Sequence, residues 1–559
     1  MNTSEIADVL KLTAQLMELH GENPFKVKSL AASAFRLGKS NLSLEGLSEE
    51  ELTEIEGIGK GIASKIHELQ TTGKLRELSE LLSSTPGGVT EMLSVNGIGP
   101  KKARVIWKEL GIESVHELLY ACNENRLLLL KGFGAKTQEQ VRKSILFSFS
   151  NKGKFRYAEA EEAAQELLEK IKSAAGVETA SFTGKIRRKC EVLEKIELLA
   201  AVPGHVSWEK LLMSFPVLKK TLEISPGQVS FSTHGGIPVT ISICQPEDFS
   251  GQLLLTTGSK EHIEKFHIHI PDKKPHSEEE IYRLNHLPFI EPEMREGMDE
   301  ISWAQKHPAS ALIEMHDLKG ILHNHTTYSD GINSLSEMAA FCKELGYGYL
   351  GICDHSRSAV YANGLSEERI REQHKEIELL NKTLAPFRIF KGIESDILSD
   401  GSLDYEDSIL STFDFVVASI HSNLKMSEEK ATERLLKAIE NPFTTILGHP
   451  TGRLLLAREG YPISHKKVID ACAEYGVVIE LNANPYRLDI DWRWIPYALS
   501  KNVMISINPD AHVKEGFYDL HYGVCAARKG GLTKESCFNA LQAEKISDHF
   551  SGRKILQKK

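Results

Sequence analysis

The C-terminal part of the chain alternates short apolar runs with amphipathic stretches. The apolar runs lie at residues 320–322, 349–353, 388–393, 415–420, 445–448, 477–481 and 503–507. Short continuous runs rich in branched residues are typical of parallel strands buried on both faces. The stretches between them carry helix signals, since Ser334 begins a capping box and Gly476 ends a helix that opens at Ser464. Strand and helix alternating seven times predict a (β/α)7 barrel, whose chemistry gathers at the carboxyl ends of the strands.

Residues of a kind that binds metals follow these runs. They are His323, His325, Asp330, His355, Glu394, His421, His449, Asp510 and His512. A single histidine after a strand is more often a satisfied core or loop residue. Six histidines and three carboxylates in phase with the strands instead predict a metal site at one end of the barrel. Asp354 and Asn482, at the same strand ends, are expected to orient the ligands.

Residues 1–150 have the spacing of short helices separated by turns, with helices expected at residues 5–19 and 25–37. The segment contains three Gly-x-Gly turns, and each has a lysine just after it and a helix beyond. The first turn has Gly57, Gly59 and Lys60, the second has Gly97, Gly99 and Lys101, and the third has Gly132, Gly134 and Lys136. This is the helix-hairpin-helix pattern, whose glycines let backbone N–H groups approach a phosphate without reading sequence. A protein–protein module built from the same hairpins is the alternative.

Residues 150–290 mix helical and strand periodicity. A helix is expected at residues 159–174, strand-like sequence at 182–191 and 196–202, and a pair of strands at 228–233 and 238–244. Residues 289–318 are rich in proline and charge and are expected to be a linker. The pattern therefore predicts a multidomain chain with α+β and α/β parts.

The order of these segments resembles the bacterial family X DNA polymerases that carry a C-terminal polymerase-and-histidinol-phosphatase (PHP) domain. The likeness covers essentially the whole chain and rests on residues 21–25, the three hairpins, Gly184 with Arg187, Arg188 and Glu191, residues 258–262, residues 279–282 and the ligand series. It implies a helix-hairpin-helix domain at 1–80, a fingers-like helical domain at 81–150, a palm-like domain at 151–245, a thumb-like domain at 246–288, the linker at 289–318 and a distorted (β/α)7 PHP barrel at 319–559.

Within this resemblance the nine PHP ligands map onto the nine residues above, and none is substituted. Imidazoles mixed with carboxylates suit Zn²⁺, Mn²⁺ or Fe better than Mg²⁺ alone, and nine ligands imply two or three divalent ions. Such ions activate water, so in-line hydrolysis of a phosphoester is the expected reaction, with Asp510 and His512 essential to it. Arg453 and Arg357 are candidates to clamp the phosphate, and a plain surface role is the alternative for each.

The palm departs from that family. Where the family has a serine before its paired arginines, this chain has Lys185, and its three aspartates are replaced by Lys195, Glu197 and Thr240. Nucleotidyl transfer needs two Mg²⁺ ions held by carboxylates. Two unit positive charges about 4 Å apart repel each other by roughly 4 kcal/mol at an effective dielectric of 20, and a lysine repels a divalent ion about twice as strongly. Glu197 alone cannot rebuild the site, so Mg²⁺ in the palm and template-directed polymerisation are not expected.

The resemblance then implies a DNA repair protein whose PHP domain is a 3′–5′ exonuclease acting on gapped or nicked DNA and on 3′ ends, including abasic sites or blocked ends. Three alternatives stay open: an active gap-filling polymerase, a small-molecule phosphatase of the histidinol phosphate kind, and a non-catalytic DNA-end scaffold. The hairpins argue against the phosphatase, and the complete ligand set argues against the scaffold.

Composition adds bounds on partners and location. The net charge is −10 and the pI is about 6.2, so DNA contact must come from local geometry rather than from overall basicity. No apolar run reaches 18 residues, no signal peptide is recognisable, and the eight cysteines form no Cys-x-x-Cys pair. A cytoplasmic monomer without membrane contact is expected.

Overall fold

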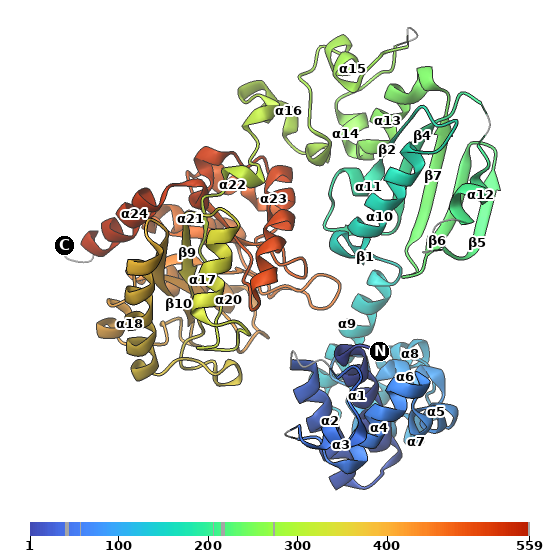
Figure 1. Ribbon diagram of the computed structural model, residues 1–559, viewed down its shortest axis with the longest axis vertical. Coiled ribbons are helices and arrows are strands. Elements are labelled where there is room, and N and C mark those ends of the chain that lie inside the picture. The colour runs from blue at the N-terminus through green and yellow to red at the C-terminus, as the bar shows by residue number, and fades with distance from the viewer. Residues whose placement is uncertain (40–43, 56, 205, 214–217, 272–273, 557–559) are drawn as a thin grey trace. The chain divides into compact units, whose positions relative to one another are not determined.

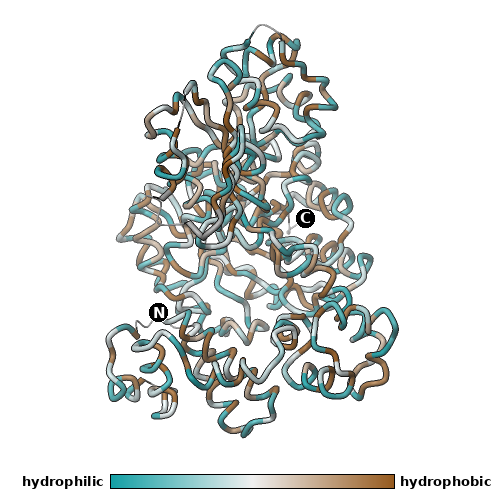
Figure 2. The backbone as a smooth tube through the Cα atoms, turned by 90° about the vertical axis from the view of Figure 1, so that its right-hand side faces the viewer, coloured by the Kyte–Doolittle hydropathy of each residue, from teal (hydrophilic) through white to brown (hydrophobic). Residues whose placement is uncertain are grey.

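The computed structural model describes residues 1–39, 44–55, 57–204, 206–213, 218–271 and 274–556. The chain divides into two compact units, Met1–Lys152 and Gly153–Lys559. Hydrophobic and hydrophilic residues alternate around the helices of both units (Figure 2), as expected where one face of each helix is buried. Within the described residues, no helix is long and apolar enough to cross a membrane.

The first unit is built of helices, drawn in blue in Figure 1. They are α1 (Thr3–His20), α2 (Pro24–Lys39), α3 (Glu49–Thr53), α4 (Lys60–Thr72), α5 (Arg76–Ser83), α6 (Gly87–Met92), α7 (Pro100–Leu110), α8 (Val115–Asn123) and α9 (Ala135–Asn151), with a 3-10 helix at Arg126–Leu129. α1 begins with a capping box between Asn2 and Glu5 and ends at Gly21, where φ is 80°. Its Leu10 and Leu19 are buried in two separate apolar clusters of this unit, so α1 links them.

The second unit begins with a mixed sheet. Its strands are β2 (Thr179–Phe182), β4 (Ile196–Ala201), β7 (Pro238–Cys244), β6 (Gln228–Thr233) and β5 (Leu218–Ser225), in that spatial order. β4 and β7 run parallel, while β2–β4, β7–β6 and β6–β5 are antiparallel pairs. α10 (Tyr157–Lys172) buries Ala160, Ala164 and Leu167 in the core of this sheet. The expected strand pair at 228–233 and 238–244 is confirmed.

The strand expected over residues 182–191 is wrong beyond Phe182. β2 ends there, and Gly184 has a φ of 59° and begins the short helix α11 (Gly184–Arg187). A Cβ at Gly184 would lie 2.0 Å from the carboxylate of Glu197, so only glycine lets the turn lie so close to β4. The short strand β3 (Val192–Leu193) then pairs with β1 (Phe155–Arg156).

Helices and an ordered connection follow the sheet. The helices after the sheet are α13 (Phe249–Thr257), α14 (Lys260–Lys265), α15 (Glu278–Leu284) and α16 (Glu300–Lys306), while α12 (Trp208–Met213) lies between β4 and β5. Residues 289–318, expected to be a linker, contain α16 and the fully buried Arg295. Arg295 donates to Oε1 of Glu278 (2.5 Å) and to the carbonyl of Ile290 (2.9 Å). Glu278 also binds Arg187, so this connection is fixed to α11 through one buried carboxylate.

The rest of the unit is a parallel barrel. Its strands, in spatial order, are β8 (Gly320–Ile321), β9 (Tyr349–Ile352), β10 (Arg388–Asp396), β11 (Phe415–Ser419), β12 (Thr444–Leu447), β13 (Val478–Asn482) and β14 (Ile505–Asn508). Its helices are α17 (Leu335–Glu344), α18 (Glu367–Leu384), α19 (Asp407–Leu410), α20 (Glu428–Glu440), α21 (His465–Tyr475), α22 (Ile495–Ser500), α23 (Leu520–Lys529) and α24 (Ala543–Leu556). A parallel bridge from Asn324 to Ala511 joins the two edge strands, so the barrel is nearly closed, as the alternation predicted.

One aromatic side chain depends on two glycines of the barrel. A Cβ at Gly351 or Gly392 would lie 2.6 or 2.5 Å from the ring of Phe415, so both strands must lack a side chain there. The Phe550 ring of α24 stacks on the Phe415 ring, with centroids 4.9 Å apart. Phe415 and Tyr349 are the first residues of β11 and β9, which places α24 at the amino end of the barrel.

We predict that Gly392→Ala destabilises the barrel by about 1–3 kcal/mol, because the added methyl group overpacks the Phe415 ring. Scanning calorimetry of the full chain should show a lower midpoint for the unfolding of the second unit. Phe415→Leu in the same chain should recover part of the loss. Gly552→Ala, on α24 with nothing within 4 Å of the new methyl group, is the control and should not lower the midpoint. Additive effects of the two barrel substitutions would contradict the packing argument.

Candidate metal centre

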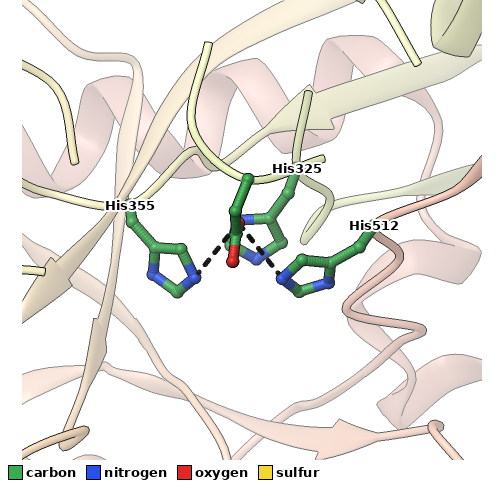
Figure 3. A group of neighbouring side chains, drawn as sticks. His325, His355 and His512 are labelled. Atoms are coloured by element: carbon green, nitrogen blue, oxygen red, sulfur yellow. Dashed lines mark ion pairs between the residues drawn. The ribbon is translucent and has the colours of Figure 1, made fainter. Parts of the chain in front are cut away.

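The carboxyl ends of the barrel strands bring the nine predicted ligands together. Among the described residues, three groups have donor atoms within 4.8 Å of one another: His325, Asp330, His355 and His512; His323, His325 and Asp510; and His355, Glu394 and His421. His449 joins the third group, because its Nε2 lies 3.0 Å from Oε1 of Glu394. Figure 3 shows the imidazoles of His325, His355 and His512 facing one another. We call these nine residues the nine-residue cluster.

Glu394 is the carboxylate at the middle of the cluster. It is 1% exposed, and imidazole nitrogens of His355, His421, His449 and His323 lie 2.9, 3.1, 3.0 and 3.4 Å from its oxygens. Burial alone would raise the pKa of Glu394, but the charges of His421, His323 and His355 hold it well below its usual range. Glu394 is therefore ionised at neutral pH and can bind cations.

Several donor atoms of the cluster are buried without a hydrogen bond in the described part of the chain. They are Nε2 of His323, Nδ1 of His325 and Nδ1 of His449, together with Nδ1 of His355 and Oε2 of Glu394, which lie 2.9 Å apart without the geometry of a hydrogen bond. Buried polar atoms normally have a partner. Nε2 of His323 lies between two carboxylates, 3.4 Å from Glu394 and 3.6 Å from Asp510. This arrangement fits divalent cations, which imidazole and carboxylate donors bind together.

The protonation of His325 also suits metal binding. Burial and the neighbouring charges of His512 and His355 lower its pKa to about 3. At neutral pH this imidazole is therefore uncharged and keeps a lone pair for a metal ion. Burial would raise the pKa of Asp510, but His323 and His325 hold it well below its usual range.

Further polar groups fix the imidazoles from behind. Oε1 of Glu480 lies 2.7 Å from Nδ1 of His323, and Oε2 of Glu480 accepts a bond of 2.8 Å from the backbone of His449. Oδ1 of Asp396 lies 2.5 Å from Nδ1 of His421. Carboxylates behind a ligating histidine orient its ring and raise its basicity. Neither Glu480 nor Asp396 was predicted from the sequence. The signal for Glu480 was a charged residue inside an apolar run, and the signal for Asp396 was an acid two positions after Glu394 on the same strand face.

Asn482 and Asp354 were expected to orient ligands, and they do so differently. Asn482 donates from Nδ2 to Oδ2 of Asp510 over 3.0 Å. Asp354 is fully buried and accepts hydrogen bonds from Thr326 and Ser329, so it shapes the loop that leads to Asp330. Asn482 thus touches a cluster residue directly, whereas Asp354 acts through the backbone before one.

The two candidate arginines have protein partners. Arg453 donates to the carbonyls of Arg487 (2.9 Å) and Leu488 and to Oδ2 of Asp491 (2.5 Å), so its guanidinium holds the loop after β13. Arg357 is exposed and donates to the carbonyl of Asp404 over 3.0 Å.

A third arginine, Arg487, lies beside the cluster and was not singled out from the sequence. Its Nε is 3.6 Å from Oδ2 of Asp510. Its Nη1 is buried and has no hydrogen-bond partner among the described residues. Arg487 therefore has unused donors next to a cluster carboxylate. Its position in the loop after a barrel strand is the signal that could have identified it.

The three Gly-x-Gly turns have the backbone that their sequence predicts. Gly57, Gly97 and Gly132 have φ values of 87°, 97° and 91°. α4, α7 and α9 begin directly after Gly59, Gly99 and Gly134, and none of these caps is closed by a side chain. Lys60, Lys101 and Lys136 are exposed. Each turn therefore presents free N–H groups of a helix N-terminus beside a lysine.

The central sheet places Glu197 and Thr240, two of the residues expected to replace the family's aspartates, side by side. The register of β4 and β7 sets Glu197 opposite Thr240. Lys195 pairs with Glu197 over 2.9 Å, and Lys185 pairs with Glu194 over 2.8 Å. No group of metal-binding side chains like those of the barrel occurs in the described part of this sheet. Glu197 is thus neutralised by a lysine of its own strand region.

Comparisons with known proteins match these features. Residues 1–75 match a helix-hairpin-helix domain, residues 89–145 a SAM-like helix-hairpin-helix tandem, and residues 322–484 the PHP domain. The DNA polymerase/3′-5′ exonuclease PolX of Bacillus subtilis is 34% identical over 566 residues, which cover 98% of this chain and 99% of that protein.

Shorter relatives match about two fifths of the chain. A probable phosphatase of Thermoanaerobacter sp. is 26% identical over 250 residues, which cover 42% of this chain and 97% of that protein. A probable phosphatase of Syntrophotalea carbinolica is 26% identical over 229 residues, which cover 39% of this chain and 90% of that protein.

We predict that Glu480→Gln weakens the binding of Mn²⁺ by about 10- to 100-fold, because the amide supports His323 and His449 less well than the carboxylate. Titration calorimetry on the metal-free chain measures this affinity. Glu474→Gln, an exposed glutamate on α21, is the matched control and should bind Mn²⁺ like the unchanged chain. An unchanged affinity in Glu480→Gln would show that Glu480 does not support the site.

Proposed function

We propose that the PHP domain of this chain is a 3′–5′ exonuclease that processes DNA ends. The premise is that the chain belongs to the family of the DNA polymerase/3′-5′ exonuclease PolX. Family and domain together make the chain a hydrolase of the phosphoesterase class. The observation that carries the narrower proposal is the complete nine-residue cluster on a chain that also has helix-hairpin-helix turns. Such turns can hold a polynucleotide backbone without reading its bases, whereas a small phosphate ester has no backbone for them to hold.

The nine-residue cluster is proposed to hold two or three divalent ions, either Mn²⁺, Zn²⁺ or Fe. When bound, the ions would activate water and stabilise charge on the phosphoryl oxygens. Glu394 would be one of the residues that hold the ions, because imidazoles of all three groups approach its two oxygens. The unpartnered imidazole nitrogens supply the remaining donors.

The chain's own residues then have separate tasks. Asp510 and His512 are proposed as essential cluster residues, and Asp330 lies between His512 (3.4 Å) and His355 (3.6 Å). Arg487 is proposed as the residue that clamps the substrate phosphate, because its partly exposed side chain lies beside Asp510 and its Nη1 has no hydrogen-bond partner among the described residues. Arg453 then supports this role by holding the backbone of Arg487.

The palm is proposed not to polymerise. The charges of Lys185 and Lys195 are balanced by Glu194 and Glu197, so the sheet is electrically satisfied without Mg²⁺. An incoming Mg²⁺ would have to displace Lys195 from Glu197 and would then find Thr240 as its neighbour. The palm would instead contribute to the binding of DNA and to the shape of the second unit.

The proposed substrates are gapped or nicked DNA and 3′ ends, including abasic or blocked ends, bound by a monomer. Backbone contacts at three turns do not read bases, so binding would be independent of sequence and would weaken with salt. A small-molecule phosphatase is the second candidate, because relatives described as probable phosphatases match part of the chain. Histidinol phosphate tested beside a gapped oligonucleotide separates the two.

We predict that His512→Ala and Asp510→Ala each lower the rate of 3′–5′ degradation of a 5′-labelled gapped duplex by more than about 100-fold, because the cluster loses a ligand. Binding to the same duplex, measured by mobility shift, should not change. His316→Ala, at an exposed histidine outside the barrel strands, is the matched control and should degrade DNA normally. Degradation at the normal rate in the two cluster variants would refute the site.

We predict that the chain adds no nucleotide to a gapped duplex supplied with the four deoxynucleoside triphosphates and Mg²⁺ or Mn²⁺, because the palm lacks the carboxylates for two ions. Extension is read on a denaturing gel. The assay uses His512→Ala, so that degradation does not mask synthesis. Template-directed extension that Glu197→Ala abolishes would overturn the proposal.

A further inference from the structure

A short 3-10 turn at Val360–Ala362 follows β9 and carries two exposed apolar side chains. Val360 is 82% exposed and Tyr361 is 63% exposed, whereas Ala359 and Ala362, on either side of them, are buried. The turn is therefore anchored by its small residues and presents its large ones. Exposed side chains of this size on an anchored turn are a common means of contact with a ligand.

The residues directly after the turn are hydrogen-bonded to the nine-residue cluster and its surroundings. The N–H of Leu365 donates to the carbonyl of His355 over 2.9 Å, and Nδ2 of Asn363 donates to the carbonyl of Ser329 over 3.3 Å. His355 is a cluster residue, and Ser329 directly precedes Asp330, which is another. The turn thus has a fixed position relative to the cluster, as a specific contact with substrate requires.

The ring of Tyr361 lies at the edge of the cluster. Its centroid is 6.1 Å from that of His355, with 57° between the two planes. The hydroxyl has no hydrogen bond among the residues that the structure describes.

We propose that Tyr361, with Val360 beside it, stacks on the terminal base of a DNA strand whose scissile phosphate lies at the nine-residue cluster. This inference rests on the proposed exonuclease function and adds to it a preference for an unpaired nucleoside at the strand end. A nucleobase offers an apolar face of the right size, and stacking is tolerant of base identity. Arg487 would hold the phosphate and Tyr361 the base, so that one nucleotide is fixed at two points.

A stacking role and a hydrogen-bonding role for Tyr361 predict different outcomes for the same two variants. If the ring matters, Tyr361→Phe keeps the contact and Tyr361→Ala loses it. If the hydroxyl donates to the phosphate or moves a proton, both variants lose it equally. Tyr475 is a matched control, because it is a tyrosine that is 39% exposed. It is the last residue of α21 and precedes the amino end of β13, which is the end of the strand away from the cluster.

The test compares two 5′-labelled single strands that differ only at the 3′ residue, which is either deoxyadenosine or a tetrahydrofuran abasic unit. The rate of the first cleavage is measured with Mn²⁺. We expect the unchanged chain to remove the adenosine about 5- to 150-fold faster, the range that one base–aromatic stack provides. Tyr361→Ala should lose this ratio and keep the abasic rate, while Tyr361→Phe and Tyr475→Ala should keep the ratio.

Three results would overturn the stacking inference and leave the exonuclease proposal standing. The first is an unchanged ratio of adenosine rate to abasic rate in Tyr361→Ala, and the second is a loss of this ratio in Tyr361→Phe as large as that in Tyr361→Ala. The third is an equal fall of both rates in Tyr361→Ala. The last result would mean that the residue supports the cluster rather than the base. If the unchanged chain cleaves neither strand, the exonuclease proposal itself fails, and the stacking inference fails with it. The two failures are therefore distinguishable.

Discussion

Ionisable side chains buried at the carboxyl end of the barrel must compensate one another, and the rest of the site follows from this requirement. Glu394 and Asp510 can be ionised inside the protein only because imidazoles surround them. The imidazoles in turn are held by Glu480 and Asp396 from behind. Several buried donor atoms of the cluster still lack a hydrogen-bond partner among the described residues. Each such atom lowers the free energy of unfolding unless a bound cation satisfies it.

The same electrostatic rule separates the barrel from the central sheet. In the barrel, the buried carboxylates are compensated by imidazoles. An imidazole can give up its proton and bind a cation with the nitrogen that held it. In the sheet, Lys195 pairs with Glu197 and Lys185 pairs with Glu194, so these two carboxylates are already compensated by lysines. The proposed loss of polymerisation and the proposed nuclease activity are two consequences of one kind of balance.

Much of the fold could be predicted from the sequence, because apolar runs followed by polar ligands fix strand direction and strand ends. All seven barrel strands, the strands at 228–233 and 238–244 and the helix that Gly476 ends lie where the pattern placed them. The helix at Gly184–Arg187 could not be predicted by alternation, because its start depends on the close approach of Glu197. Glu480, Asp396 and Arg487 were missed because their roles depend on contacts between strands or loops that are distant in sequence.

The most direct measurement of the central claim is anomalous diffraction from crystals of the full chain grown with Mn²⁺. The account predicts two or three strong peaks among the nine barrel residues, with Glu394 contacting more than one of them, and no peak beside Glu197. Peaks beside Glu197 and Thr240 with none at the barrel would contradict it, and so would imidazoles that bind no ion at all.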